Sequence, residues 1–178
     1  MTAPTSAGVT TSSTTAEEPS SSSKLSDRGN VQKKFGEPAG ITVSGQNEKP
    51  EPVLDFTVKS VDLNTKCTSP VAMPAENGHL VSVNVEAKTG AAAPFKKAFY
   101  GQDFSFNPAD WKFVDDKGTT ANSVMTNPVF NCLDPKELLR DMGPAERASG
   151  KIVLDLPSTK GTLIYAPSIL DQAWEWTL

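Results

Sequence analysis

The chain has 178 residues, 37% of them hydrophobic, and a formal net charge of −4. An acidic chain without a basic stripe lacks a surface for phosphate backbones, so nucleic acid is excluded as the main partner. No apolar run approaches the length that a transmembrane helix needs, and no apolar signal core follows Met1. The chain therefore fits either a cytoplasmic protein or a mature secreted protein that was given a start Met.

Residues 1–38 form a distinct N-terminal region that is rich in Ser, Thr, Ala, Pro, Glu and Lys. Such a segment cannot bury enough apolar surface to offset its conformational entropy, so we expect a disordered linker over residues 1–38. The remaining residues 39–178 match the usual size of one domain. A Ser/Thr-rich tether suggests a domain that stands away from a cell surface, and an ordinary disordered terminus is the alternative.

The first half of the domain alternates apolar and polar residues between turns, as half-buried strands do. A first strand begins at residues 41–43. A second covers residues 53–63, and its apolar positions change face near Ser60, which predicts a β-bulge. After a long loop over residues 64–78, a strand over residues 80–87 places alternate side chains inward (Val81, Val83, Val85, Ala87) and the others toward solvent (Ser82, Asn84, Glu86).

Residues 89–94 are expected to form a loop of small residues, followed by short strands over residues 103–106 and 111–114. The next segment predicts one short helix over residues 135–142. Asp134 occupies the N-cap position, Pro135 the first helical position, and a Gly-Pro pair follows the segment.

The C-terminal residues 151–178 contain strand patterns over 151–156, 162–165 and 173–178. In the last of these, Trp174 and Trp176 face the core, and the strand is expected to pair with residues 150–156 or 162–165. The whole chain therefore predicts an all-β antiparallel sandwich of about seven or eight strands with one short helix. The side chains expected on the opposite faces of these strands are Val153, Asp155, Ala173, Glu175 and Thr177.

The chain contains two cysteines, Cys67 and Cys132. Neither belongs to a CxxC or Cys/His cluster, and a single His leaves too few ligands for structural zinc. We predict a disulfide between them, which would stabilise the fold by about 4 kcal/mol in the chain-entropy model. Two unrelated buried thiols are the alternative.

The sequence predicts no catalytic, metal-binding or cofactor-binding residues. The sole histidine, His79, precedes a strand, and the chain has neither a G-x-S-x-G elbow nor a phosphate-binding loop. Asp115 lies in a tight turn, where Asp bonds local backbone amides. Phe99 and Tyr100 fall outside the strongest strands, so we predict them as a possible partner contact.

Several motifs carry a family resemblance. Residues 104–118 (FSFNPADWKFVDDKG) are similar to a strand-and-turn section of the bacterial DUF4352 domain. Residues 143–157 (GPAERASGKIVLDLP) resemble a second section, with the Gly and Pro exchanged, and residues 35–38 and 56–61 look like its opening. The resemblance implies an immunoglobulin-like β-sandwich of secreted proteins and lipoproteins in Gram-positive bacteria and some phages. Related actinobacterial secreted antigens have no assigned catalysis.

We therefore expect a non-enzymatic, extracytoplasmic binding or adhesion domain that is a monomer, with an unknown protein or cell-envelope partner. Lipoproteins of the family carry a signal peptide, a lipid-modified Cys and a Ser/Thr-rich linker. Only the linker is present here, so membrane contact would need a lipid anchor outside this sequence. The alternatives are a passive structural or immunomodulatory surface antigen, and a hydrolase in which His79 meets a Ser and an acid.

Overall fold

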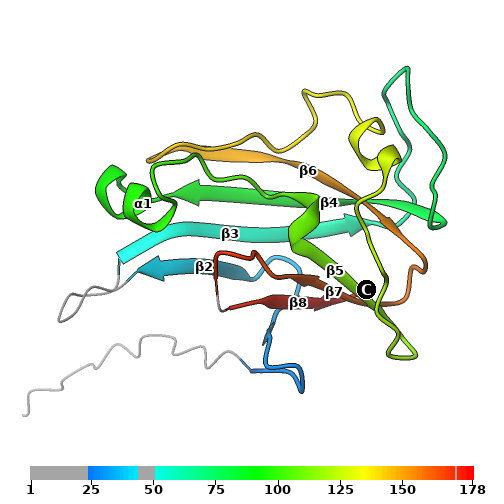
Figure 1. Ribbon diagram of the computed structural model, residues 1–178, viewed down its shortest axis with the longest axis horizontal. Coiled ribbons are helices and arrows are strands. Elements are labelled where there is room, and N and C mark those ends of the chain that lie inside the picture. The colour runs from blue at the N-terminus through cyan, green and yellow to red at the C-terminus, as the bar shows by residue number, and fades with distance from the viewer. Residues whose placement is uncertain (1–23, 44–50, 171) are drawn as a thin grey trace, which may run out of the picture.

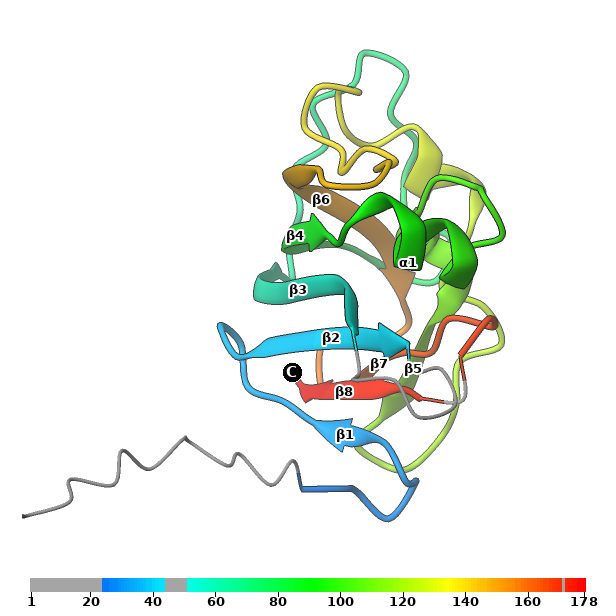
Figure 2. The same ribbon diagram turned by 90° about the vertical axis from the view of Figure 1, so that its left-hand side faces the viewer.

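The computed structural model describes residues 24–43, 51–170 and 172–178, which form two four-stranded sheets packed face to face (Figures 1 and 2). This confirms the predicted all-β sandwich with one short helix. The sheet orders are β1-β8-β7-β5 and β2-β3-β4-β6. No helix among the described residues is long and apolar enough to cross a membrane. The elements are β1 (Val31–Gln32), β2 (Pro38–Val43), β3 (Glu51–Asp62), β4 (His79–Thr89), α1 (Ala92–Ala98), η1 (Pro108–Asp110), β5 (Trp111–Asp115), η2 (Asn127–Phe130), β6 (Arg147–Leu156), β7 (Gly161–Tyr165) and β8 (Trp174–Thr177).

An aromatic core joins the two sheets. The ring of Phe56 in β3 meets Tyr165 and Trp174 of the facing sheet edge-on, with centroids 5.6 and 5.1 Å apart. Trp174 and Trp176 are each 1% exposed, as predicted. β8 pairs antiparallel with β7, with Leu163 opposite Trp176, which confirms the expected closing strand. The predicted bulge is also confirmed, because the β3–β4 register shifts between Val58 and Ser60.

A second, smaller apolar cluster covers the outer face of β6. Val153 packs there against Val129, Cys132 and Leu133. The prediction that Val153 and Asp155 face away from the core is therefore incomplete, since both are buried by the loops that lie over this face. Ser82 in β4, opposite Val153, is also buried rather than facing solvent.

The helix predicted over residues 135–142 is wrong. The Lys151 N–H donates to the Glu137 carbonyl and the Leu139 N–H donates to the Lys151 carbonyl, at 2.9 and 3.0 Å, so this segment lies along the edge of β6. A helix would need the same backbone groups. The Asp134 carboxylate accepts from the Lys136 N–H in a local turn instead of capping a helix.

The α-helix among the described residues is α1, which begins within the loop predicted over residues 89–94. Its N-cap residue, Ala91, makes no side-chain hydrogen bond, so the usual start signal is missing from the sequence. Burial of Phe95 holds α1 on the sandwich. Phe104 and Phe106 are buried, but Phe104 makes only an isolated bridge to Met142 instead of the strand predicted over residues 103–106.

The linker prediction is wrong for residues 24–38, and residues 1–23 lie outside the described residues. Val31 of β1 pairs in parallel with Trp174 of β8 (Figure 2), and β2 begins at Pro38. The side chains of Arg28 and Asn30 reach the Glu175 carboxylate, at 3.5 and 2.9 Å. Glu175, expected on the outer side of the last strand, is consequently 6% exposed.

Candidate binding surface

A disulfide joins two long connections at one end of the sandwich. Cys67 lies in the β3–β4 loop and Cys132 follows η2, and their Cα atoms are 4.5 Å apart. The predicted disulfide is therefore confirmed. Residues 63–78 and 119–134 are called the disulfide end below (Figure 1). Disulfides form and persist in oxidising compartments, so this bond fits a domain that functions outside the cytoplasm.

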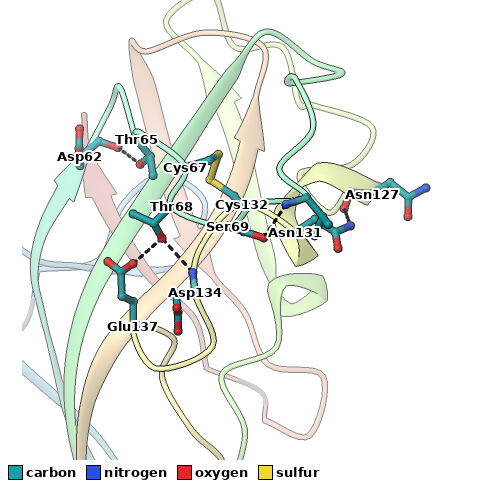
Figure 3. The surroundings of a disulfide bond; sticks show 11 residues. Asp62, Thr65, Cys67, Thr68, Ser69, Asn127, Asn131, Cys132, Asp134 and Glu137 are labelled. Atoms are coloured by element: carbon teal, nitrogen blue, oxygen red, sulfur yellow. Dashed lines mark hydrogen bonds between the residues drawn. A yellow bond between two sulfur atoms is a disulfide. The ribbon is translucent and has the colours of Figure 1, made fainter.

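Hydrogen bonds around Thr68 reinforce the disulfide. The N–H groups of Thr68 and Ser69 both donate to the Cys132 carbonyl, at 2.8 and 3.0 Å. The Thr68 hydroxyl donates to the Glu137 carboxylate and accepts from the Asp134 N–H, as Figure 3 shows. These bonds lower the freedom of both connections near the disulfide, because each bond joins residues far apart in the sequence.

Hydrogen bonds to the carboxylate of Asp155, in β6, anchor both connections. Its side chain is 0% exposed, and one carboxylate oxygen accepts hydrogen bonds from the Glu76 N–H, the Asn77 N–H and the Thr126 hydroxyl, at 2.7, 3.1 and 2.7 Å. The Asn77 side chain in turn donates to the Ser123 carbonyl. A buried carboxylate needs such partners, because an unpaired charge is costly in the interior. Asp155 thus connects the two halves of the disulfide end.

The disulfide end exposes large apolar side chains on these anchored connections. Val71 is 66% exposed, Phe130 58%, Met73 41% and Met125 38%. The Asn131 amide lies 4.0 Å from the Met73 sulfur, so the two connections meet close to their exposed residues. Apolar side chains gathered on an exposed surface are typical of interaction sites.

The disulfide end is also free of charge over two long runs. Residues 67–75 and 118–133 contain no Asp, Glu, Lys, Arg or His, although 21% of the chain is charged. Interface centres are depleted of charged residues in the same way. The sequence contains these charge-free runs, but by themselves they do not indicate which side chains face solvent.

The predicted contact pair, Phe99 and Tyr100, is divided by the structure. Phe99 is buried, with its ring centroid 4.8 Å from Phe95 and 4.9 Å from Phe104, so it belongs to the core. Tyr100 is 85% exposed and has a positive φ of 53°. Only Tyr100 faces solvent, and its contact with a partner stays a prediction.

Tyr100 borders a groove at the other end of β4. The groove has a volume of about 390 Å³ and is lined in part by Asp103, Asp110 and Ile169. Burial raises the pKa of Asp110 above its ordinary value, although a hydrogen bond from the Ser168 backbone lowers it in part. Helix α1 with residues 99–110 and 166–170 is called the α1 end below.

The remaining candidates are His79 and Asp115. His79 is the first residue of β4 and pairs with Leu156. The Asp115 carboxylate accepts from the Lys117 and Thr119 N–H groups, as the turn prediction requires, and the Thr119 bond contributes most to a lowered Asp115 pKa. No group of three His, Cys, Asp or Glu side chains in the described part of the chain could hold a metal ion.

No family model matches this chain, and the comparison with curated proteins finds no match. The resemblance to DUF4352 therefore stays a prediction. Among solved structures, the chain is similar to the yjhA protein from Bacillus subtilis, with 16% identity and a TM-score of 0.40. The match covers 74% of this chain and 78% of that chain. A likeness at this level carries no argument about function.

Proposed function

We propose that this chain is a non-enzymatic, extracytoplasmic binding domain that holds a partner protein at its disulfide end. One observation carries the proposal: Val71, Met73 and Phe130 are exposed on two connections that a disulfide and the buried Asp155 carboxylate hold together. Surface loops without a role in binding gain nothing from exposed apolar side chains, whereas the centre of an interface uses them.

The chemistry of this surface favours a protein partner over a charged polymer. Binding to a polyanion depends on Lys and Arg, and residues 67–75 and 118–133 have neither. Ordered connections also reduce the entropy that must be lost on binding. The partner should therefore present an apolar surface, and its affinity should depend little on salt.

The disulfide supports an extracytoplasmic location, because glutathione and thioredoxin keep cytoplasmic thiols reduced. The resemblance to DUF4352 supports the finer proposal of a secreted or lipid-anchored protein at a bacterial cell surface. Electrospray mass spectrometry with and without reductant tests the disulfide in protein taken from its own host. Two free thiols in that sample would contradict the location.

Site-specific cross-linking tests the binding proposal. The full chain would carry a photo-reactive benzoylphenylalanine at Val71, or at Lys88 on the exposed sheet face as a control. Cell-envelope material should give one defined adduct from Val71 and none from Lys88. The adduct should persist at about 1 M salt, where charge interactions are screened within about 3 Å.

Two matched substitutions complete the test. Phe130→Ser should weaken the recovered partner at least about tenfold, because exposed aromatic anchors carry much of an interface's free energy. Leu25→Ser removes an apolar side chain of nearly the same exposure, 59% against 58% for Phe130, outside the disulfide end and should leave affinity unchanged. Equal adducts from Val71 and Lys88, or equal loss in both variants, would contradict the proposed surface and favour a passive surface antigen.

A further inference from the structure

We infer that the groove at the α1 end is a second binding site, which takes an arginine side chain from a peptide or protein. The groove is lined by Tyr100, Asp103, Asp110 and Ile169, among others, and its volume of about 390 Å³ lies near the lower limit of small-ligand sites. It therefore has room for one long side chain and the adjoining backbone. This inference does not rest on the proposed function of the disulfide end.

The charges of the groove are uncompensated. Its lining includes two carboxylates, Asp103 and Asp110, and no Lys, Arg or His. Neither carboxylate belongs to an ion pair within the described residues. A cation in the groove would restore the interaction that the Asp110 carboxylate loses through burial, which is the reason for its raised pKa.

The negative charge of Asp110 also acts on a buried tyrosine, Tyr165. Tyr165 is 0% exposed, and its hydroxyl has no hydrogen-bond partner within the described residues. Burial raises the pKa of Tyr165, and the negative charge of Asp110 raises it further. No ion pair within the described residues neutralises the Asp110 charge.

Tyr100 supplies an aromatic surface beside these carboxylates. It follows the C-cap of α1, where the Gly101 N–H donates to the Lys96 carbonyl at 2.8 Å in a Schellman arrangement. Glycine usually occupies this left-handed position, so the exposed Tyr side chain costs backbone strain and is not compensated by burial. The exposed Tyr100 ring is accessible for stacking on a cation.

Arginine fits this combination better than lysine. Its planar guanidinium can stack on the Tyr100 ring and donate paired hydrogen bonds to a carboxylate at the same time. Lysine offers a compact charge without that planar geometry. Asp103 and Asp110 would accept from the guanidinium, while Ile169 would contact the methylene groups.

Nuclear magnetic resonance titration of the full chain tests the site, with N-acetyl-arginine methylamide as the probe. N-acetyl-citrulline methylamide is the neutral control, because it has nearly the same shape without the charge. Arginine should produce saturable shifts over residues 99–110 and 167–169, and citrulline should produce none. Equal shifts with both probes would overturn the inference.

Three variants sharpen the result. Asp110→Asn should weaken arginine binding at least about tenfold, because it removes a charge-assisted hydrogen bond. Tyr100→Leu should weaken binding about threefold through the lost cation–π contact. Asp116→Asn makes the same charge change in an exposed turn outside the groove and should leave binding unchanged. Unchanged affinity in Asp110→Asn, with the rest of its spectrum preserved, would reject the site.

Discussion

The two ends of the sandwich hold their connections by different forces and expose different chemistry. At the disulfide end, a covalent bond and the buried Asp155 carboxylate fix two connections that have long charge-free runs and exposed apolar side chains. At the α1 end, packing of Phe95 and Phe99 fixes the chain, and the surface carries unpaired carboxylates beside an exposed Tyr100. One scaffold can therefore present an apolar contact whose affinity depends little on salt and a charged contact that salt weakens.

The largest expected effect comes from removing the disulfide with Cys67→Ser and Cys132→Ser together. The bond closes a loop of 65 residues, and its loss should lower the free energy of unfolding by about 4 kcal/mol. Urea denaturation measures this difference. Hydrogen exchange should also rise more at the disulfide end than in α1. Equal increases at both ends would remove the distinction between them.

Asp155→Ala should produce the next largest effect. The change leaves the Glu76 and Asn77 N–H groups without their acceptor and should cost about 1–3 kcal/mol. Hydrogen exchange should accelerate over residues 63–78 and 119–134 while the core of α1 stays protected. Asp116→Ala, an exposed Asp, provides the control and should change neither quantity. Unaltered exchange in Asp155→Ala would show that the disulfide alone holds these connections.

Tyr100→Gly should act in the opposite direction at the α1 end. Glycine adopts the φ of 53° without steric cost, so the variant should be more stable by about 0.5–1 kcal/mol. Thermal unfolding measures the increase, with Lys97→Gly, at an α1 helical position, as a destabilising control. A Tyr100→Gly variant that loses stability would show that the ring stabilises the fold by packing on the domain, instead of being exposed for a ligand.

The smallest effect concerns the pH dependence of the stability that Glu137 contributes through its contact with Thr68 of the disulfide end. Hydrogen bonds from Thr68 and then from Lys151 hold the pKa of Glu137 below its ordinary value of 4.5. A lowered folded-state pKa means that this contact stabilises the fold above pH 4.5, and that the stabilisation is lost as the pH falls through the lower, folded value. The difference in free energy of unfolding between the native chain and Glu137→Gln should therefore be present at neutral pH and disappear at acidic pH. A difference that stays constant with pH would contradict this contact.

The sequence allowed the sandwich and its closing strand to be predicted, because strand alternation is a local signal. The disulfide could be predicted because two cysteines allow only one pairing. Tertiary contacts overrode local signals elsewhere. Residues 135–142 carry good helix-start chemistry but bond to the edge of β6, and α1 forms without a capping side chain. Glu175 is polar yet buried, because Arg28 and Asn30 from the supposed linker lie over it.

Of the two candidate surfaces, the sequence indicated the one at Tyr100 but not the one at the disulfide end. Tyr100 was expected at a contact, because it lies outside the strong strand patterns. The exposure of Val71 and Phe130 could not be predicted, since an apolar residue in a loop looks the same whether it packs inward or faces water. The outcome depends on tertiary contacts, such as the disulfide and the Asp155 hydrogen bonds, that join segments far apart in the sequence.

The parallel pairing of β1 with β8 has a mechanical consequence. Suppose that the chain before Lys24 is pulled while a partner holds the disulfide end. The force then acts on β1 before it acts on the other strands of the two sheets. β1 is two residues long and is held in part by the bonds from the Val31 and Lys33 N–H groups to β8 and its preceding residue. It should detach first and lengthen the connection by up to roughly 45 Å. The force would thus reach the bound sandwich only after the released segment is fully extended.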